Sequence, residues 1–285
     1  MKPAPFAYRR ADTTAEAVTL LADEGDEAKI LAGGQSLVPM LNFRLVRPTA
    51  LIDVSRIDAL RYLSRDDDVL RIGALTRHLD IERSADPRIR ADFGYLRDAA
   101  KLVGHYPIRT AGTMGGSLAH ADPSAEWCLL ALLLDAEIEM TSLRGRRSVR
   151  ASDFFSGYYE TALEPDEILT EVRLPARWSR VALREFARRS GDFALVSAAV
   201  AVELEGDVFV AARVALGGVA PKPVRVDLAE QALVGSHPTD EVLRQAGRLA
   251  ADDVRPPADV HGSSEYRTKL VAVLVEQALR KAVQR

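Results

Sequence analysis

The sequence contains a single cysteine and no apolar stretch of the length that a membrane span requires. One thiol, Cys128, cannot form an internal disulfide or supply the four cysteines that an iron–sulfur cluster normally needs. The longest apolar run, residues 127–134, falls well short of the roughly 18 residues of a transmembrane helix, and we expect it to be a buried helix. Residues 1–14 have no apolar signal core. We therefore expect a cytoplasmic protein in which Cys128 is a small buried side chain.

The sequence also lacks a strong excess of positive or negative charge. The chain has 285 residues, a formal net charge of −3 and a pI near 6.0, so its composition predicts no general attraction to nucleic acid or anionic membranes. With 47% hydrophobic and 28% charged residues it is typical of a globular protein long enough for two domains. No metal site is expected, because the histidines are scattered without ligand spacing and most of them suit surface or capping positions: His78, His105, His120, His237 and His261.

Helical and strand patterns alternate along the chain and favour an α+β fold with mostly antiparallel sheet. Thr13 and Glu16 form a capping-box signature for a helix that stops at Gly25. Thr76 is expected to cap a helix through Arg83. Further helices are predicted at residues 93–103, 240–251 and 266–283, and strands at 29–31, 51–54, 69–74, 136–141, 147–149 and 168–174.

Two further patterns concern the second half of the chain. Residues 175–179 contain proline and small polar residues that interrupt both the helical and the strand periodicity of the sequence, which indicates a domain boundary. The strand-like runs 195–204 and 208–217 flank Gly206, and together they predict a β-hairpin.

The first candidate binding segment follows the strand at 29–31. Gly33 and Gly34 would let backbone N–H groups point into one concavity, and no Cβ atom would block an approaching pyrophosphate. Taken alone, the pair is better explained by a tight turn that needs positive φ. The spacing matches neither GxGxxG nor a P-loop, so the Rossmann and NTPase folds are not predicted.

The second candidate segment, residues 108–118, contains three glycines and several hydroxyl side chains. It leads to Asp122 and Pro123, which we expect to be the N-cap and first-turn residues of the apolar helix that ends at Leu134. Glu126 would then share a helix face with Asp122. Carboxylates repel phosphates and suit ribose or ribityl hydroxyls better, so Asp122 can be a cap or a ligand.

The segments LAGGQSL and GTMGGSLAHADPSAEW resemble those of the FAD-binding medium subunit of the molybdenum hydroxylases, the group of aerobic carbon monoxide dehydrogenase and xanthine dehydrogenase. Four more segments resemble that subunit in the same order, so the resemblance covers essentially the whole chain: FAYRRADTTAEAVTLL, FFSGYYETALEPDEILTEVRLP, RRSGDFALVSAAVAV and EYRTKLVAVLVEQAL.

The resemblance implies a fold and a set of partners. Residues 1–176 would form a two-part FAD-binding domain of the vanillyl-alcohol-oxidase-like (PCMH) type, with subdomains at about 1–56 and 57–176. Residues 177–285 would form a smaller C-terminal domain with an antiparallel sheet and helices. A large subunit would carry the molybdenum cofactor and a small one two [2Fe–2S] clusters, in a dimer of heterotrimers. This chain would pass electrons from the clusters through FAD to an external acceptor such as NAD, oxygen or a quinone, and its single cysteine agrees with clusters held elsewhere.

The same resemblance implies the contacts of a non-covalent FAD. Residues 32–36 would wrap the pyrophosphate, and residues 113–117 would form a second cradle in which Ser117 stands where asparagine is common. Glu126 and Asp122 match acidic positions of two branches of the family, and His120 lies between cradle and carboxylate. Phe193, otherwise a core aromatic residue at a strand start, matches a residue that leans over the flavin ring. The full expected set is Leu31, Ala32, Gly33, Gly34, Gln35, Ser36, Leu37, Thr110, Thr113, Gly115, Gly116, Ser117, His120, Asp122, Glu126, Ile168, Leu169 and Phe193.

Two other functions stay open from the residues. A freestanding FAD-dependent oxidoreductase of the same fold would act on a small substrate without partners. Covalent flavin attachment is not expected there, because Gln35 and Ser36 stand in the first segment and Cys128 lies in an apolar helix. A non-enzymatic interaction module would leave the paired glycine segments unexplained. No catalytic acid–base pair is predicted, and neither substrate nor electron acceptor is implied.

Overall fold

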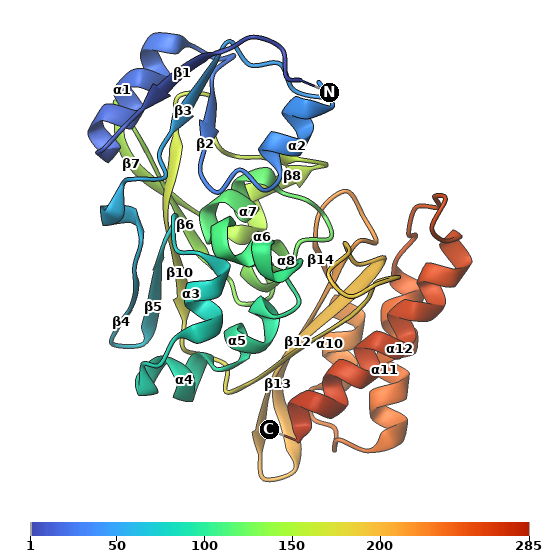
Figure 1. The fold of residues 1–285 in the computed structure, drawn as a ribbon. Coiled ribbons are helices and arrows are strands. Elements are labelled where there is room, and N and C mark those ends of the chain that lie inside the picture. Colours follow the sequence, from blue (N-terminus) through green and yellow to red (C-terminus); the bar gives the residue numbers. More distant parts are fainter. Residues whose placement is uncertain (1, 285) are drawn as a thin grey trace.

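In the computed structural model, which describes residues 2–284, three sheets of three or more strands follow one another along the chain, and a two-stranded hairpin is added to them (Figure 1). The first is a parallel sheet with the order β1-β3-β2. Helix α1 packs Ala17, Val18 and Leu21 into the cluster beneath this sheet. The elements of this part are β1 (Ala7–Arg10), α1 (Thr14–Glu24), β2 (Lys29–Leu31), α2 (Leu37–Asn42), β3 (Ala50–Asp53) and the 3-10 helix η1 (Asp58–Leu60).

The expected ends of α1 are confirmed. The Thr13 hydroxyl accepts a hydrogen bond from the Glu16 N–H at 3.1 Å, and Gly25 ends the helix with φ of 78°. The capping box is only half formed, because the Glu16 carboxylate accepts from the N–H of Asp12 and not from that of Thr13. The local sequence pattern therefore predicted the helix and its first cap contact. The position of the preceding residue, Asp12, determined which N–H group the Glu16 carboxylate accepts from.

The second sheet has the order β4-β5-β10-β6-β7, and all its neighbours are antiparallel. Alternate residues such as Ile72, Val172 and Ile138 pair across it and face the largest core cluster. The strands are β4 (Leu63–Asp66), β5 (Val69–Gly73), β6 (Glu137–Ser142), β7 (Gly145–Arg150) and β10 (Ile168–Pro175). The predicted strands at 69–74, 136–141, 147–149 and 168–174 are therefore confirmed.

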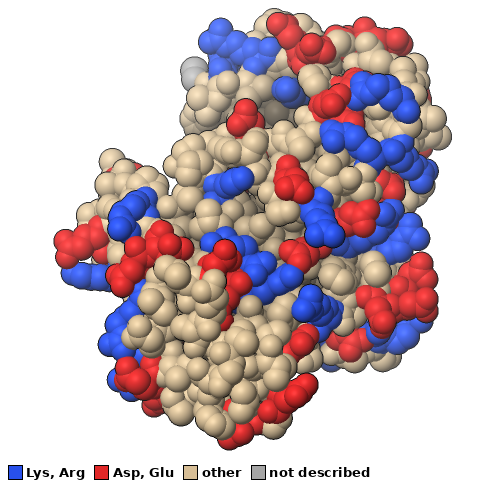
Figure 2. Space-filling view, turned by 180° about the vertical axis from the view of Figure 1, so that it is seen from behind, with Lys and Arg blue, Asp and Glu red and all other residues tan. Residues whose placement is uncertain are grey.

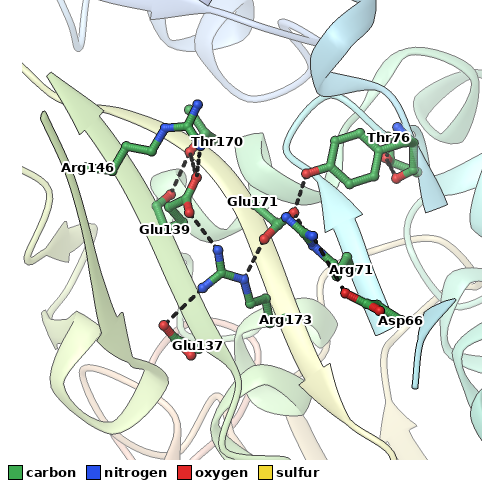
Figure 3. A network of polar contacts seen from close by, with 10 residues as sticks. Asp66, Arg71, Thr76, Glu137, Glu139, Arg146, Thr170, Glu171 and Arg173 are labelled. Carbon is green, nitrogen blue, oxygen red and sulfur yellow. Dashed lines mark hydrogen bonds and ion pairs between the residues drawn. The ribbon is translucent and has the colours of Figure 1, made fainter. Parts of the chain in front are cut away.

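The opposite face of this sheet carries a network of paired charges (Figure 3). Glu171, 2% exposed, accepts hydrogen bonds from Tyr62, Arg71 and Arg173, and Arg173 also contacts Glu139 at 2.6 Å. Burial by itself would raise the pKa of Glu171, but these donors outweigh it and the pKa is lowered. The carboxylate is therefore a fixed ionic centre of the sheet.

Short helices connect β5 to β6 and cover the core (Figure 1). They are α3 (His78–Arg83), α4 (Pro87–Phe93), α5 (Tyr95–Ala100), α6 (Tyr106–Ala111), α7 (Met114–His120) and α8 (Glu126–Leu133). The helix predicted over 93–103 is present as the shorter α5, because the chain turns at Gly94 and Phe93 is the last residue of α4. Thr76 is not the cap of α3; Arg77 takes that position, and the Thr76 hydroxyl donates to the carbonyl of Tyr62.

Helix α8 is apolar all round and is buried from Trp127 to Leu133, as the sequence predicted. Cys128 is fully buried within it. After β7 come α9 (Ala151–Phe154) and a small hairpin of β8 (Phe155–Gly157) and β9 (Glu160–Thr161), neither of which the sequence pattern indicated.

The third sheet is antiparallel with the order β11-β12-β13-β14. Its alternate residues divide between two cores. Ala199 and Ala215 face the cluster that contains α8, whereas Val200 and Val214 face the cluster of α10 to α12. The elements are β11 (Arg180–Phe186), β12 (Val196–Glu205), β13 (Val208–Gly217), β14 (Val224–Arg225), α10 (Asp227–Leu233), α11 (Asp240–Asp253) and α12 (Ser264–Val283).

The predicted hairpin and the two C-terminal helices are thus confirmed, and Gly206 forms the turn with φ of 61°. Residues 176–179 connect strands of different sheets. No helix in the described part of the chain combines the length and apolar character that crossing a bilayer would take.

Candidate functional site

The first glycine segment leaves a row of backbone donors free. Gly34 has φ of 69°, and the Gln35 side chain donates to the carbonyl of Gly33 at 2.9 Å. Within residues 2–284, the N–H groups of Gly33 to Leu37 have no recorded acceptor. The tight turn and the anion-binding segment are therefore compatible with each other. The positive φ of Gly34 makes the turn, and the turn leaves N–H groups that suit an anionic group.

The two glycine segments touch each other. A Cβ atom placed on Gly33 would lie 2.2 Å from the carbonyl oxygen of Ala111 and 2.8 Å from the Cα atom of Gly112. A Cβ atom on Gly116 would lie 3.9 Å from that of Ala32. The fold therefore brings residues about 80 positions apart into one site, and Gly33 is required for their close approach.

The second segment is largely helical. Its residues form α6 and the first turn of α7, whose N-cap Thr113 accepts from the Gly116 N–H at 3.1 Å. The N–H groups of Met114 and Gly115 donate to the carbonyls of Thr76 and Ala74, each at 2.9 Å. These amides already have acceptors within the protein, so contacts of the expected second cradle with FAD would have to come from its other groups.

Side chains are what this segment still offers. The Ser117 hydroxyl is half-buried and has no recorded partner within residues 2–284, whereas the Thr110 hydroxyl donates to the carbonyl of Pro107 at 2.7 Å. Gly115 serves packing, since a Cβ atom there would lie 2.6 Å from that of Ala74. The first segment therefore supplies backbone donors, and the second supplies a supporting surface with a single free hydroxyl.

Asp122 forms a turn and does not begin α8. It accepts from the Ser124 N–H at 2.8 Å, while α8 begins at Glu126 with Ala125 as its N-cap. The prediction that Asp122 and Glu126 share a helix face is therefore wrong. The reason is local, because the Asx turn closes before the helix can start.

Tyr159 is a site residue that sequence reasoning missed. Its hydroxyl lies 3.3 Å from the Asp122 carboxylate, and its ring centroid lies 5.0 Å from that of His120. The pKa of Tyr159 is raised, by burial and then by Asp122. Burial lowers the pKa of His120 more than Asp122 raises it. Tyr159 has φ of 55° in the turn between β8 and β9, and only its place within a family-like segment could have indicated it.

Glu126 faces a second carboxyl group, Glu185, from the C-terminal sheet. Burial, and then the charge of Glu185, raises the pKa of Glu126 to about 8; burial raises that of Glu185 to about 7. Glu185 pairs with Ser197 across β11 and β12. One oxygen of Glu185 and the hydroxyl of Ser197 are buried without a partner in the described structure. Sequence reasoning missed Glu185, because only the packing of the sheet against α8 brings the two carboxyls together.

The last three expected contacts differ in their exposure to solvent. Ile168 and Leu169 are 4% and 5% exposed and belong to core clusters, so they offer little surface to a ligand. Phe193 is 66% exposed and is therefore not the core aromatic residue that its pattern also allowed. The loop that contains Phe193 contacts the N-terminal end of α6. A Cβ atom on Gly191 would lie 2.3 Å from Nδ1 of His105, the N-cap of that helix.

His78 is buried and not a surface or capping residue, which corrects the expectation for this histidine. It accepts from the Trp127 indole N–H at 3.0 Å, and burial, followed by the charge of Arg109, lowers its pKa to about 4. It supports the second segment, because a Cβ atom on Gly112 would lie 2.7 Å from its Nε2 atom. In the described part of the chain, His, Cys, Asp and Glu form no group of three or more suited to a metal ion.

Two family models match this chain in succession. The FAD binding domain in molybdopterin dehydrogenase matches residues 4–177, and the CO dehydrogenase flavoprotein C-terminal domain matches residues 181–282.

Known proteins match over the full length. The 6-hydroxypseudooxynicotine dehydrogenase complex subunit alpha of Paenarthrobacter nicotinovorans is 39% identical, covering 100% of this chain and 97% of that protein. The carbon monoxide dehydrogenase medium chain of Hydrogenophaga pseudoflava is 35% identical, covering 99% and 98%. Quinoline 2-oxidoreductase from Pseudomonas putida 86 has a solved chain with a TM-score of 0.95 and 38% identity, covering 100% and 99%.

Proposed function

Because this chain belongs to the family of FAD-binding medium subunits of molybdenum hydroxylases, we propose that it holds the FAD pyrophosphate on the N–H groups of Gly33 to Leu37. It is an oxidoreductase subunit that takes part in electron transfer within a multi-subunit complex. The free amides of the first segment support the phosphate assignment most directly, because a phosphate would satisfy donors that the protein leaves unused.

The remaining expected contacts divide by chemistry. The half-buried Ser117 hydroxyl can donate to a phosphate or accept from a sugar hydroxyl. Asp122 and Glu126 suit ribose or ribityl hydroxyls, and His120 with Tyr159 forms an aromatic wall beside Asp122. The exposed Phe193 is available to lie over a ring. Bound FAD would supply reversible electron transfer, and the chain's own residues bind it, orient it and exclude water.

The proposal also assigns a role to each partner subunit of this chain. We assign electron delivery to a small subunit with [2Fe–2S] clusters and substrate oxidation to a large molybdenum subunit, arranged as a dimer of heterotrimers. The single cysteine supports this division, since it leaves the clusters to another chain. Residues 1–176 would be the FAD-binding unit, with subdomains at about 1–56 and 57–176, and residues 177–285 the second domain.

Substitution of Gly33 tests the phosphate assignment. In Gly33→Ala the new methyl group would meet the carbonyl oxygen of Ala111, so the loop must shift and its amides lose their common direction. We expect the affinity of the apoprotein for FAD to fall at least tenfold, or about 1.4 kcal/mol. Titration of the apoprotein with FAD, followed by flavin absorption and fluorescence, measures this.

Gly206→Asn is the matched control. Gly206 also has positive φ, but a Cβ atom there meets nothing within 4 Å, and asparagine tolerates this conformation. The control should bind FAD as the unaltered chain does. Equal affinities for Gly33→Ala and the control would contradict the assignment, and no FAD binding by the unaltered chain would contradict the proposed function itself.

A further inference from the structure

Helix α12 has a buried arginine at its N-terminal end. On the face of the molecule in Figure 2, Lys and Arg side chains lie at the surface among acidic groups, where water solvates them. Arg267, the fourth residue of α12, is only 6% exposed. A cation here meets the positive end of the helix dipole, and burial adds a desolvation cost. Its Nε atom has no partner within the described residues. The stability of α12 therefore does not explain this arginine.

The other two nitrogens of the Arg267 guanidinium join two segments to the start of α12. Nη1 donates to the carbonyl of Leu195 at 2.6 Å and, at the longer distance of 3.4 Å, to that of Gly218. Nη2 donates to the Asp259 carboxylate at 2.6 Å, which balances the charge. Because the guanidinium group is planar and rigid, these contacts fix the carbonyls of Leu195 and Gly218 relative to each other.

Leu195 closes the loop that carries Phe193. We call residues 187–195 the β11–β12 loop. The Leu195 N–H donates to the last carbonyl of β11 at 2.8 Å, and β12 begins at the next residue. The loop is also held at Gly191, which packs against the ring of His105. Phe193 lies between these two contacts and is 66% exposed, so the direction of its side chain depends on how the loop is held.

Gly218 connects the same arginine to the Asp122 turn. The Gly218 N–H donates to the carbonyl of Pro123 at 2.9 Å. Gly218 has φ of 75°, and a Cβ atom there would lie 2.7 Å from the carbonyl oxygen of Leu195 and 3.2 Å from Oγ of Ser124. The β11–β12 loop and the Asp122 turn therefore approach each other so closely at this glycine that no side chain fits between them.

We propose that Arg267 is a positioning residue of the FAD site: it holds the β11–β12 loop against the Asp122 turn, so that Phe193 and Asp122 face one ligand. The inference rests on the proposed function, in which both residues contact FAD. Arg267 acts through the carbonyls that it fixes and not through contact with the cofactor. Without it the loop would have to become ordered when FAD binds, which lowers affinity. The amides of Gly33 to Leu37 belong to another part of the chain, so FAD should still bind.

Arg267→Met tests this role, because methionine fills much of the same space but donates no hydrogen bond. In the separate full-length chain, we expect the affinity for FAD to fall about tenfold. The visible circular dichroism of the bound flavin should change in the direction that Phe193→Ala produces. The double variant Arg267→Met/Phe193→Ala should lose less affinity than the two single losses combined, because Arg267 acts partly through Phe193.

Arg213→Met is the matched control. Arg213 is also largely buried and donates to a main-chain carbonyl, that of Leu133 at 3.0 Å, and to a carboxylate, that of Asp135. Leu133 is the last residue of α8, at the opposite end of this helix from the Asp122 turn. The control should lower the melting temperature but leave FAD affinity and flavin circular dichroism unchanged. Equal effects of the two methionine variants on the flavin would show a merely structural role and overturn the proposal.

Arg267→Lys keeps the buried charge and decides the question if the methionine variant does not fold. Lysine presents a single nitrogen and does not hold both carbonyls in a fixed arrangement. We expect a folded chain with reduced FAD affinity and altered flavin circular dichroism. Flavin spectra and FAD affinity like those of the unaltered chain in the folded Arg267 variants would overturn the proposal, as would full additivity with Phe193→Ala. Absence of FAD binding in the unaltered chain would instead show that the proposed function has failed.

Discussion

At the scale of single residues, similar glycine pairs perform different tasks. Gly33 permits the contact with Ala111, and Gly34 makes a turn that leaves amides free. Gly115 and Gly116 lie in a helix whose amides are used by the protein. The sequence identified both pairs as candidates, but the partners of the amides depend on residues 74 and 76, which no local pattern connects to them.

Glu126 and Glu185 predict an unusual dependence of stability on pH. Their pKa values in the folded apoprotein, about 8 and about 7, lie above the ordinary value of 4.5, so the folded state binds more protons than the unfolded state between these limits. Their contribution is present below pH 4.5 and is lost as pH rises to about 8. We expect the free energy of unfolding to fall by about 2 kcal/mol or more between pH 5 and pH 8.5.

Glu185→Gln should flatten this profile, since one of the two coupled protons is removed and Glu126 loses its charged neighbour. Urea unfolding of the apoprotein at pH 5.5, 7.0 and 8.5 measures the change. Glu205→Gln, at an exposed position of the same sheet, should keep the slope of the unaltered chain. Parallel profiles for all three proteins would show that the carboxyls do not share a buried environment.

At the scale of elements, the periodicity of apolar residues and the cap residues predicted most of the regular helices and strands. The strands at 29–31 and 168–175, the hairpin around Gly206 and the apolar helix α8 follow from local patterns. The bounds of short helices were predicted less well by the same patterns. The helix predicted from residue 93 to residue 103 begins only after Gly94 and ends at Ala100, and the Asx turn of Asp122 delays α8, because tertiary packing decides where a short helix starts and stops.

The charge network of the second sheet predicts unequal effects for two glutamates (Figure 3). Glu171→Ala would leave Arg71 and Arg173 without the buried carboxylate that both contact. We expect a loss of about 3 kcal/mol in the free energy of unfolding. Glu265→Ala removes an exposed pair with Lys269, which solvent screens, and should leave the free energy of unfolding nearly unchanged. Equal losses in guanidinium unfolding would contradict the structural role assigned to Glu171.

At the scale of the whole molecule, the two matched regions share a core. Ala199 and Ala215 of the C-terminal sheet belong to the same cluster as α8, and Arg213 donates to the carbonyl of Leu133 at 3.0 Å. The linker at 176–179 separates the regions in sequence, yet apolar packing joins them. The carboxyl groups of Glu126, in α8, and Glu185, in β11, lie where the two regions pack against each other.

Shared packing predicts cooperative unfolding. We expect one calorimetric transition for the apoprotein, with equal calorimetric and van't Hoff enthalpies. A fragment ending at residue 178 should fail to fold alone, because it would expose the face of α8 that the third sheet covers. Two separated transitions, or a stably folded fragment, would show that the regions are independent.

The sequence alone determined the family, the single cysteine that leaves the clusters to other chains, and the regular elements, because these depend on residue type and local period. Only the tertiary structure decided which glycine segment has free amides, since Thr76 and Ala74 occupy those of the second. Tertiary packing likewise brought Tyr159 to Asp122 and Glu185 to Glu126. Such contacts join residues far apart in the chain, and their energies depend on burial that no local pattern encodes.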